Sequence, residues 1–237
     1  MERGFNLRDQ TAGDGVEAGS RSDFVADAAH ELRSPLTALK LQAQALRRAD
    51  EDSAAREAGI ARLNQGIDRA IHLVEQLLVL AREEAGAGQA SAIGEQINLQ
   101  DVVKLAVADV LPLARHKQID LGLAENQAPE LLQVRGQSEA LRILLRNLLD
   151  NAVKYTPEAG QVDVSLHLHA GQPVLTIEDS GPGIAPDDRP RVFDRFFRAS
   201  DVALESGSGL GLAIVKVIAQ RHGATLALDR SDRLGGL

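Results

Sequence analysis

The chain has 237 residues, of which 44% are hydrophobic and 25% are charged, so it is long enough for one full domain and a smaller companion. Its formal net charge is −8 and only 3% of its residues are aromatic. Both values argue against nucleic acid as a partner, because nucleic-acid binding needs basic grooves and stacking faces. The absence of cysteine excludes disulfides, thiolate zinc sites and thiol catalysis.

The N-terminal segment is rich in glycine and polar side chains and has no hydrophobic period, so residues 1–21 are predicted to form a flexible lead-in. No apolar stretch follows Met1 as it would in a signal peptide, and no run reaches the roughly 20 apolar residues of a membrane span. We therefore expect a soluble chain of cytoplasmic character.

Two long helices are predicted within residues 22–84. The first begins near Ser22 or Asp23, either of which is a plausible N-cap, and the second covers residues 54–84. Both carry apolar residues at spacings of three and four, which is typical of helices packed against other helices. These residues are Val25, Ala29, Leu32, Leu36, Leu39, Ala43 and Leu46, then Ile60, Leu63, Ile67, Ala70, Val74, Leu77 and Ala81. The short connection predicts an antiparallel hairpin.

A second apolar flank of the hairpin includes Ala28, Ile71 and Leu78, and a single hairpin cannot bury it. We therefore predict that two chains form a four-helix bundle, which makes the protein a homodimer. Core packing within one chain is the alternative interpretation.

His30 lies outside the apolar seam of the first helix, so we expect its side chain to face solvent beside Glu31. Pro35 follows inside the helix, where a proline costs about 3 kcal/mol and favours a bendable backbone. A surface histidine on a kinked helix is the simpler interpretation of these residues alone. The motifs further along the chain make His30 the candidate for modification.

Residues 85–96 are small and flexible in character and are predicted to be an interdomain linker. Residues 97–237 have a mixed pattern, which predicts an α/β sandwich large enough to fold alone. We predict strands at residues 96–99, 118–124, 131–134, 161–169, 173–178 and 224–228, and helices at residues 100–115, 138–155 and 209–222.

Asn147, Asn151 and Lys154 lie at spacings of four and three, so they share one helical face. Amide oxygens suit Mg²⁺, which usually keeps several waters and takes other oxygens from substrate phosphates. Lys154 adds a point charge for those phosphates. By itself, this pattern is also common on polar helix faces.

Two glycine-rich segments flank a long loop. Residues 179–184 close a strand, where the Asp179 carboxylate can accept a hydrogen bond from an exocyclic amine such as that of adenine. Residues 207–212 open a helix, whose free N–H groups favour phosphate. The loop between them is long enough for a lid, and its Arg195 or Arg198 could reach a γ-phosphate.

Taken together, five segments resemble the H, N, G1, F and G2 boxes of the bacterial sensor histidine kinases, most closely the QseC and TctE type. They occur in the expected order at residues 24–37, 147–157, 179–184, 193–198 and 207–212. The resemblance implies a dimeric helical hairpin that carries phosphotransfer, followed by an ATP-binding domain of the Bergerat or GHKL type.

The resemblance also implies roles for individual residues. His30 would be the phosphoacceptor, and Glu31 would hydrogen-bond or deprotonate its imidazole. Asn147 and Asn151 would hold Mg²⁺. The nucleotide contacts would come from the same two asparagines and from Lys154 and Arg198 on phosphate, Tyr155 and Asp179 at adenine, and the glycine-segment residues Gly181, Gly183, Gly207, Gly209, Leu210 and Gly211.

The implied activity is protein-histidine kinase: autophosphorylation on His30 with ATP and Mg²⁺, then transfer to an aspartate of a response-regulator receiver domain. Phosphatase activity toward the regulator is a further expectation, for which Ser34 keeps a hydroxyl that can orient water. Family members are usually membrane receptors, so this chain would be a cytoplasmic portion of a bacterial inner-membrane protein, anchored only through segments absent from it. Relatives continue into another strand beyond the position of Leu237.

Two rival functions remain open at this stage. An ATPase or chaperone of the Hsp90, gyrase and MutL group would share the nucleotide fold but lack the His-Glu hairpin. A dimeric scaffold that binds nucleotide as a switch would form no phosphohistidine.

Overall fold

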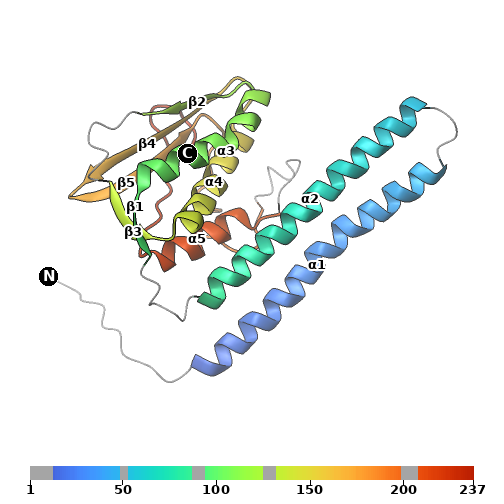
Figure 1. Ribbon diagram of the computed structural model, residues 1–237, viewed down its shortest axis with the longest axis horizontal. Coiled ribbons are helices and arrows are strands. Elements are labelled where there is room, and N and C mark those ends of the chain that lie inside the picture. The colour runs from blue at the N-terminus through green and yellow to red at the C-terminus, as the bar shows by residue number, and fades with distance from the viewer. Residues whose placement is uncertain (1–12, 49–52, 87–93, 125–131, 199–207) are drawn as a thin grey trace. The chain divides into compact units, whose positions relative to one another are not determined.

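The computed structural model describes residues 13–48, 53–86, 94–124, 132–198 and 208–237 (Figure 1). The chain divides into two compact units, with the division between Leu77 and Leu78. Within the described residues, no helix combines the length and the apolar character needed to cross a bilayer.

The predicted helical hairpin is formed by α1 (Gly13–Arg48) and α2 (Ser53–Gly86), and the N-terminal unit contains α1 and most of α2. α1 begins before Ser22, so the prediction that the helix starts near Ser22 or Asp23 is wrong. The flexibility of the predicted lead-in, residues 1–21, stays a prediction. No proline interrupts this stretch, and alanine, glutamate and arginine can continue a helix through a residue that could also cap one. The linker boundaries stay a prediction, because residues 87–93 lie outside the described residues.

Two glycines of α2 form notches for leucines of α1. A Cβ atom on Gly59 would lie 2.8 Å from Leu46 Cδ1, and one on Gly66 would lie 2.8 Å from Leu39 Cδ2. These glycines lower the intrinsic stability of the helix by about 1 kcal/mol each. They allow the two helices to approach closely, which explains their place in an otherwise helix-favouring sequence.

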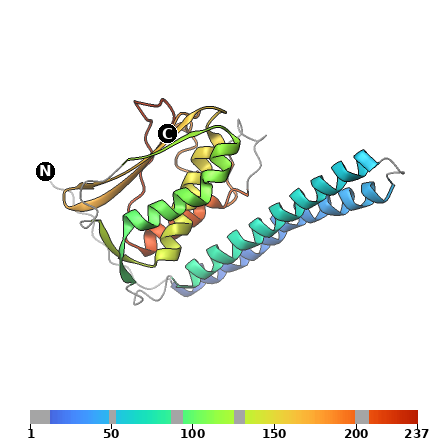
Figure 2. The same cartoon turned by 45° about the horizontal axis from the view of Figure 1, so that its top comes forward.

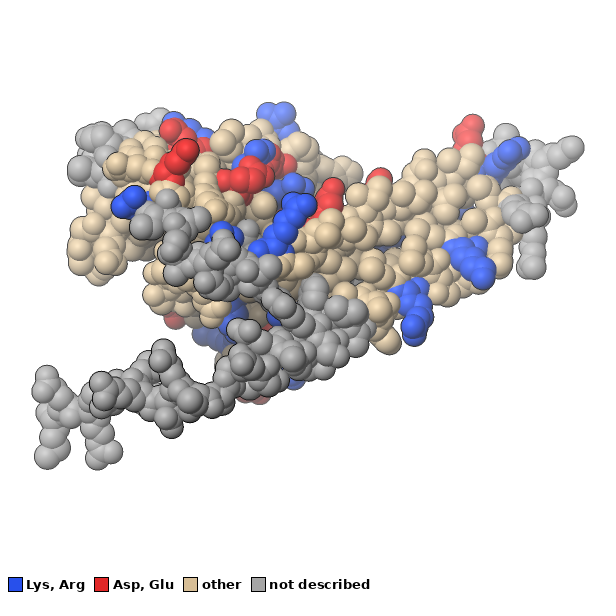
Figure 3. Space-filling model, turned by 60° about the horizontal axis from the view of Figure 1, so that its bottom comes forward, with Lys and Arg blue, Asp and Glu red and all other residues tan. Residues whose placement is uncertain are grey.

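A large part of the apolar surface of the hairpin stays exposed in the single chain. Seam residues Ile60, Ile67 and Val74 are 42%, 40% and 41% exposed. The predicted second flank includes Ile71 and Leu78, which are 51% and 50% exposed. Figure 3 shows the drawn face of the hairpin as largely uncharged, with scattered charged side chains. Leu73, Leu77 and Leu80 of α2 are buried, so the single chain covers part of the apolar surface of the hairpin and leaves the rest exposed.

The C-terminal unit is the predicted α/β domain. Its elements are β1 (Glu95–Asn98), α3 (Leu99–His116), β2 (Asp120–Leu123), β3 (Gln133–Gly136), α4 (Ser138–Tyr155), β4 (Gln161–His169), β5 (Gln172–Asp179) and α5 (Gly211–Arg221).

The strand predicted at residues 224–228 is wrong, because these residues have no regular secondary structure. The Ala224 N–H donates to the Ala219 carbonyl at 2.9 Å and so closes the end of α5. No strand of the described residues pairs with this segment. An extended segment without a neighbour gains no ladder hydrogen bonds, and alternation in the sequence cannot reveal that.

The main sheet has the strand order β2-β4-β5, with β2 parallel and β5 antiparallel to β4. The loop between β4 and β5 is Ala170-Gly171, and both residues have positive φ angles (50° and 78°), as a tight hairpin turn requires. β1 and β3 form a separate antiparallel pair. Figure 2 shows α3, α4 and α5 on one side of the main sheet.

The core lies between this sheet and the three helices. Val162, Val164 and Leu166 of β4 are buried on the helix-facing side. α4 packs against both α3 and α5. Its fully or nearly fully buried side chains are Ala140, Leu141, Leu144, Leu145, Leu149, Ala152 and Val153. α4 is therefore the central helix, which fixes the polar face that it carries.

Two polar contacts secure α4 to its neighbours. The Arg142 guanidinium donates to both carboxylate oxygens of Asp109 on α3 at 2.7 and 2.8 Å, and these bonds hold the pKa of Asp109 below its usual range. At the start of α4, the Gln137 N–H donates to Nε2 of His222 at 3.1 Å. His222 Nδ1 lies 2.8 Å from the Ile218 carbonyl, so one imidazole links the end of α5 to the start of α4.

Candidate functional site

The His30 side chain faces solvent, as predicted, and is 75% exposed. Its Nδ1 lies 3.7 Å from Glu31 Oε1, which is close enough for an ion pair when the ring is protonated but too long for a hydrogen bond. Ser34 is also exposed and lies one turn further along α1. α1 is continuous through Pro35, so a break in the helix is not needed to present these side chains.

On α4, the two predicted asparagines lie against the start of α5. The Asn147 amide nitrogen donates to the Ile143 carbonyl at 2.8 Å, which fixes the orientation of the amide group. A Cβ atom on Gly211 would lie 3.0 Å from Asn147 Oδ1 and 3.7 Å from Asn151 Nδ2. The absence of a side chain at Gly211 thus keeps the amide groups accessible beside the first turn of α5.

Lys154 and Tyr155 end α4 as a pair. Lys154 Nζ lies 3.2 Å from the Tyr155 hydroxyl and 4.7 Å from the centre of its ring. Tyr155 is 36% exposed, so its ring has a face on which another flat group could stack. A Cβ atom on Gly181 would lie 3.0 Å from the Tyr155 carbonyl oxygen. The first glycine segment therefore packs directly against the end of α4.

Asp179 at the end of β5 is a buried carboxyl group, only 8% exposed. It accepts hydrogen bonds from the Gly181 N–H at 2.8 Å and the Leu237 N–H at 3.4 Å. Burial raises the pKa of Asp179, and the two hydrogen bonds partly oppose this rise. Gly183 has a φ of +73°, which favours glycine. A buried acceptor of this kind suits an amine donor better than water.

The second glycine segment meets α4 at the start of α5. Leu210 is fully buried and occupies the N-cap position without a side-chain oxygen to cap the helix. The N–H groups of the first turn are thus suited to an anion. Gly209 has a φ of +71°. Gly207 lies outside the described residues.

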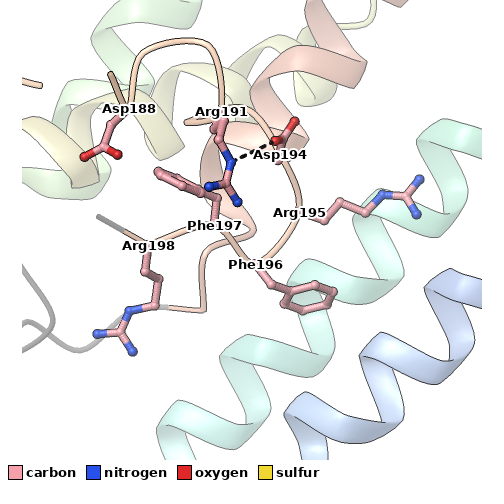
Figure 4. A pocket seen from close by; sticks show the side chains of 7 residues that line it. All are labelled: Asp188, Arg191, Asp194, Arg195, Phe196, Phe197 and Arg198. Atoms are coloured by element: carbon pink, nitrogen blue, oxygen red, sulfur yellow. Dashed lines mark ion pairs between the residues drawn. The ribbon is translucent and has the colours of Figure 1, made fainter. Parts of the chain in front are cut away.

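The loop before this segment has its own cavity, of about 400 Å³, shown in Figure 4. Its lining residues are Asp188, Arg191, Asp194, Arg195, Phe196, Phe197 and Arg198, and none belongs to α4 or β5. Arg191 lies over the Phe197 ring at 4.8 Å and pairs with Asp194 at 4.0 Å. Arg198 thus lines a cavity formed by its own loop, and its predicted contact with phosphate stays a prediction.

Sequence reasoning missed Ser180, whose hydroxyl accepts a hydrogen bond from the Gln161 N–H at 2.8 Å. The Ser180 N–H in turn donates to the Gln161 carbonyl at 3.0 Å. These bonds hold the first glycine segment to the start of β4. A serine between an aspartate and a glycine was the available signal, but only the fold shows its partner.

The residues brought together fit a nucleotide with its magnesium ion. Asn147 and Asn151 offer neutral amide oxygens, which suit a Mg²⁺ ion that takes its other oxygens from phosphate and water. Among the described residues, no group of three histidine, aspartate or glutamate side chains could hold a metal by itself. Asp179 suits an exocyclic amine, and the start of α5 suits phosphate.

Comparison with known families agrees with this division of the chain. The His Kinase A (phospho-acceptor) domain matches residues 20–86, which include His30. The histidine kinase-, DNA gyrase B- and HSP90-like ATPase domain matches residues 136–236, which include the α4, β5 and α5 site residues. The chain belongs to the sensor histidine kinases. The phospho-acceptor match separates this kinase from the gyrase and chaperone ATPases that share only the nucleotide fold.

Individual sensor kinases are similar over most of the chain. The sensor protein QseC of Salmonella typhi is 41% identical over 90% of this chain and 45% of its own length. The signal transduction histidine-protein kinase/phosphatase MprB of Mycolicibacterium vanbaalenii is 34% identical over 95% of this chain and 46% of its own length. The solved Acinetobacter baumannii histidine kinase AdeS has a TM-score of 0.59 at 27% identity, over 81% of this chain and 86% of that one. This kinase chain thus spans about half the length of these curated relatives.

Proposed function

We propose that the chain catalyses ATP-dependent phosphorylation of His30 and passes the phosphoryl group to an aspartate of a response-regulator receiver domain. The observation that supports it most directly is the pairing of a solvent-facing His-Glu pair on a phospho-acceptor domain with a separate ATPase domain in the same chain.

His30 would act as the nucleophile. Its Nδ1 is the nitrogen near Glu31, so Nε2 is the one available to attack the γ-phosphorus. The new N–P bond forms as the bond to the ADP oxygen breaks, and the Nδ1 proton passes to Glu31 or to water. Glu31 orients the ring for this step.

The α/β domain would hold and position the nucleotide. Asp179 accepts a hydrogen bond from the adenine amine, Tyr155 supplies a stacking face, and Lys154 and the first turn of α5 contact phosphate. Asn147 and Asn151 would be the protein ligands of Mg²⁺. When bound, Mg²⁺ neutralises charge on the phosphates, and phosphoryl transfer needs little beyond such neutralisation and correct positioning.

We further propose that the hairpin forms a homodimer. A second copy would cover the exposed apolar residues Ile60, Ile67, Ile71, Val74 and Leu78 in a four-helix bundle. We also propose that the rest of the protein includes membrane segments and that this portion lies in the cytoplasm beneath a bacterial inner membrane. This fits the 45% of QseC that the chain spans.

Incubation with γ-labelled ATP tests the kinase assignment. We expect an acid-labile, alkali-stable label that is lost in His30→Gln, because a phosphoramidate bond is acid-labile and glutamine cannot form one. Undiminished label in His30→Gln would overturn the assignment of the acceptor. Mixing labelled protein with purified receiver domains then tests transfer to aspartate.

Phosphatase activity toward the regulator is a second candidate. The relative MprB bears the name kinase/phosphatase, and Ser34 presents an exposed hydroxyl one turn from His30. We expect Ser34→Ala to slow the loss of label from a phosphorylated receiver while autophosphorylation of His30 continues. Equal rates of loss would remove Ser34 from this role.

A further inference from the structure

Lys117 directs its whole hydrogen-bonding capacity at the end of α4. Its ammonium donates to the carbonyls of Val153 at 3.0 Å, Lys154 at 2.6 Å and Thr156 at 2.7 Å. A lysine has three N–H donors, so all of them are used on this turn. Lys117 itself lies just after α3 and is half-buried.

These contacts replace donors that the helix cannot provide. The last four carbonyls of any helix lack an intrahelical partner, and Pro157 supplies no N–H of its own. A positive charge at a helix C-terminus also complements the helix dipole. The backbone of Lys117 adds a further link, because its carbonyl accepts from the Ala159 N–H at 3.1 Å. Lys117 thus holds both sides of the turn after α4.

The same turn carries the proposed adenine site. Tyr155 is the residue in this turn whose carbonyl Lys117 does not contact, and that carbonyl faces Gly181 instead. Gly181 in turn donates to the Asp179 carboxylate. A displacement of the turn would therefore move the Tyr155 ring and the backbone that orients Asp179.

We infer that Lys117 is a positioning residue for nucleotide binding, acting through the end of α4 without touching the nucleotide. This inference rests on the proposed kinase function and deepens it. It concerns the adenine side of the site, so the effect should be the same for ADP and ATP.

The test compares Lys117→Met with Lys104→Met, which changes an exposed lysine of α3. We expect the affinity of Lys117→Met for both ADP and ATP to fall by the same factor, about tenfold, which corresponds to about 1.4 kcal/mol. The rate of His30 phosphorylation at saturating ATP should stay within about twofold of wild type. Lys117→Arg should recover part of the affinity, since a guanidinium also donates to carbonyls.

Unchanged ADP and ATP affinity in Lys117→Met, even with a lower unfolding temperature, would show a structural role only and overturn the inference. If Lys117→Met does not fold, Lys117→Gln, which keeps two donors on a shorter chain, serves for the same comparison. Failure of the wild-type chain to bind ADP or ATP would overturn the proposed function itself, and the inference with it.

Discussion

The backbone N–H of Phe196 donates to the carbonyl of Gly209 at 2.9 Å, although the two residues are not neighbours in the sequence. Phe196 has a φ of 60° and Gly209 a φ of 71°, so both lie in the left-handed region. A phenylalanine in that region costs roughly 1–3 kcal/mol and persists only where the surroundings impose it. This bond therefore holds Phe196 beside the residues that lead into α5.

Substitution of Gly209 by alanine should open this junction. A Cβ atom at Gly209 would lie 2.6 Å from the Phe196 carbonyl carbon and 2.7 Å from its Cα, and backbone cannot yield as a flexible side chain does. We expect Gly209→Ala to weaken ATP binding by at least about tenfold, because the phosphate-facing turn of α5 shifts. Titration with ADP and ATP measures the effect.

Gly171→Ala is the matched control for backbone strain. Gly171 has a φ of 78°, but a Cβ atom there would meet nothing within 4 Å. The Gly171→Ala substitution should lower the free energy of unfolding by about 1 kcal/mol and leave the affinity for nucleotide unchanged. Equal losses of affinity in the two variants would show that strain alone, and not contact with Phe196, produces the effect.

Asp179→Asn should make the nucleotide-free protein more stable and the nucleotide bind more weakly. Burial raises the pKa of Asp179, so ionisation of this carboxyl opposes folding. A group of this kind favours the folded state below its unfolded pKa and loses that contribution as the pH rises through the folded pKa. At pH 8, we expect the free energy of unfolding of Asp179→Asn to exceed that of wild type by about 1 kcal/mol. The affinity for ATP should fall, because the charge-assisted hydrogen bond from the adenine amine is lost.

Unfolding by urea across pH 4 to 8 measures this dependence. The advantage of Asp179→Asn should shrink toward acid, where the wild-type carboxyl is protonated and resembles the amide. A constant difference between the two proteins at every pH would show that the charge of Asp179 is not its cause.

The sequence predicts the elements better than the contacts between them. The limits of α4 and β4 follow from periodicity and from Thr156-Pro157, and the structure confirms both. The strand predicted at residues 224–228 fails because strand formation depends on a neighbour, which periodicity does not report. The prediction that α1 starts near Ser22 fails for a related reason, since a residue that can cap a helix can also lie inside one.

The candidate site divides in the same way. Spacing alone groups Asn147, Asn151 and Lys154, because one helix carries all three. Gly211 packs against Asn147 and so brings together two segments that are remote in the sequence. The resemblance to the N and G2 boxes predicts that both segments bind nucleotide, but it does not predict this contact. The hydrogen bonds from Lys117 to the end of α4 could not be predicted from the sequence, since the side chain of a lysine after a helix usually points into water.

Arg233→Gln should destabilise the sheet in a salt-dependent way. Arg233 bridges Asp163 Oδ2 at 2.6 Å and Glu178 Oε2 at 2.9 Å, and these two acidic residues are direct partners across β4 and β5. Without the guanidinium, two like charges face each other, which disfavours the pairing. All three side chains are partly exposed, so we expect a decrease in unfolding temperature of only about 1–2 °C at low salt, and less at high salt.

The pH dependence gives a second readout of this cluster. Hydrogen bonds from Ser231 and Arg233 lower the pKa of Glu178 from its ordinary value of 4.5. The contribution of ionised Glu178 to the free energy of unfolding is therefore present at neutral pH and is lost as the pH falls below 4.5. Arg230→Gln, at an exposed position in the same segment, removes the same charge as a control. A similar pH-dependent loss in Arg230→Gln would point to net charge as the cause.

Gly66→Ala tests the notch between the hairpin helices. Alanine favours helix over glycine by about 1 kcal/mol, but its Cβ would lie 2.8 Å from Leu39 Cδ2 and 3.1 Å from Gln42 Oε1, and overpacking costs about 1–3 kcal/mol. We expect a net loss of about 1 kcal/mol, measured by helical circular dichroism in urea at fixed protein concentration. In a Leu39→Ala background the space is free, so the same substitution should stabilise the hairpin. A gain of equal size in both backgrounds would mean that Leu39 does not fill the notch, because independent sites give additive changes in free energy.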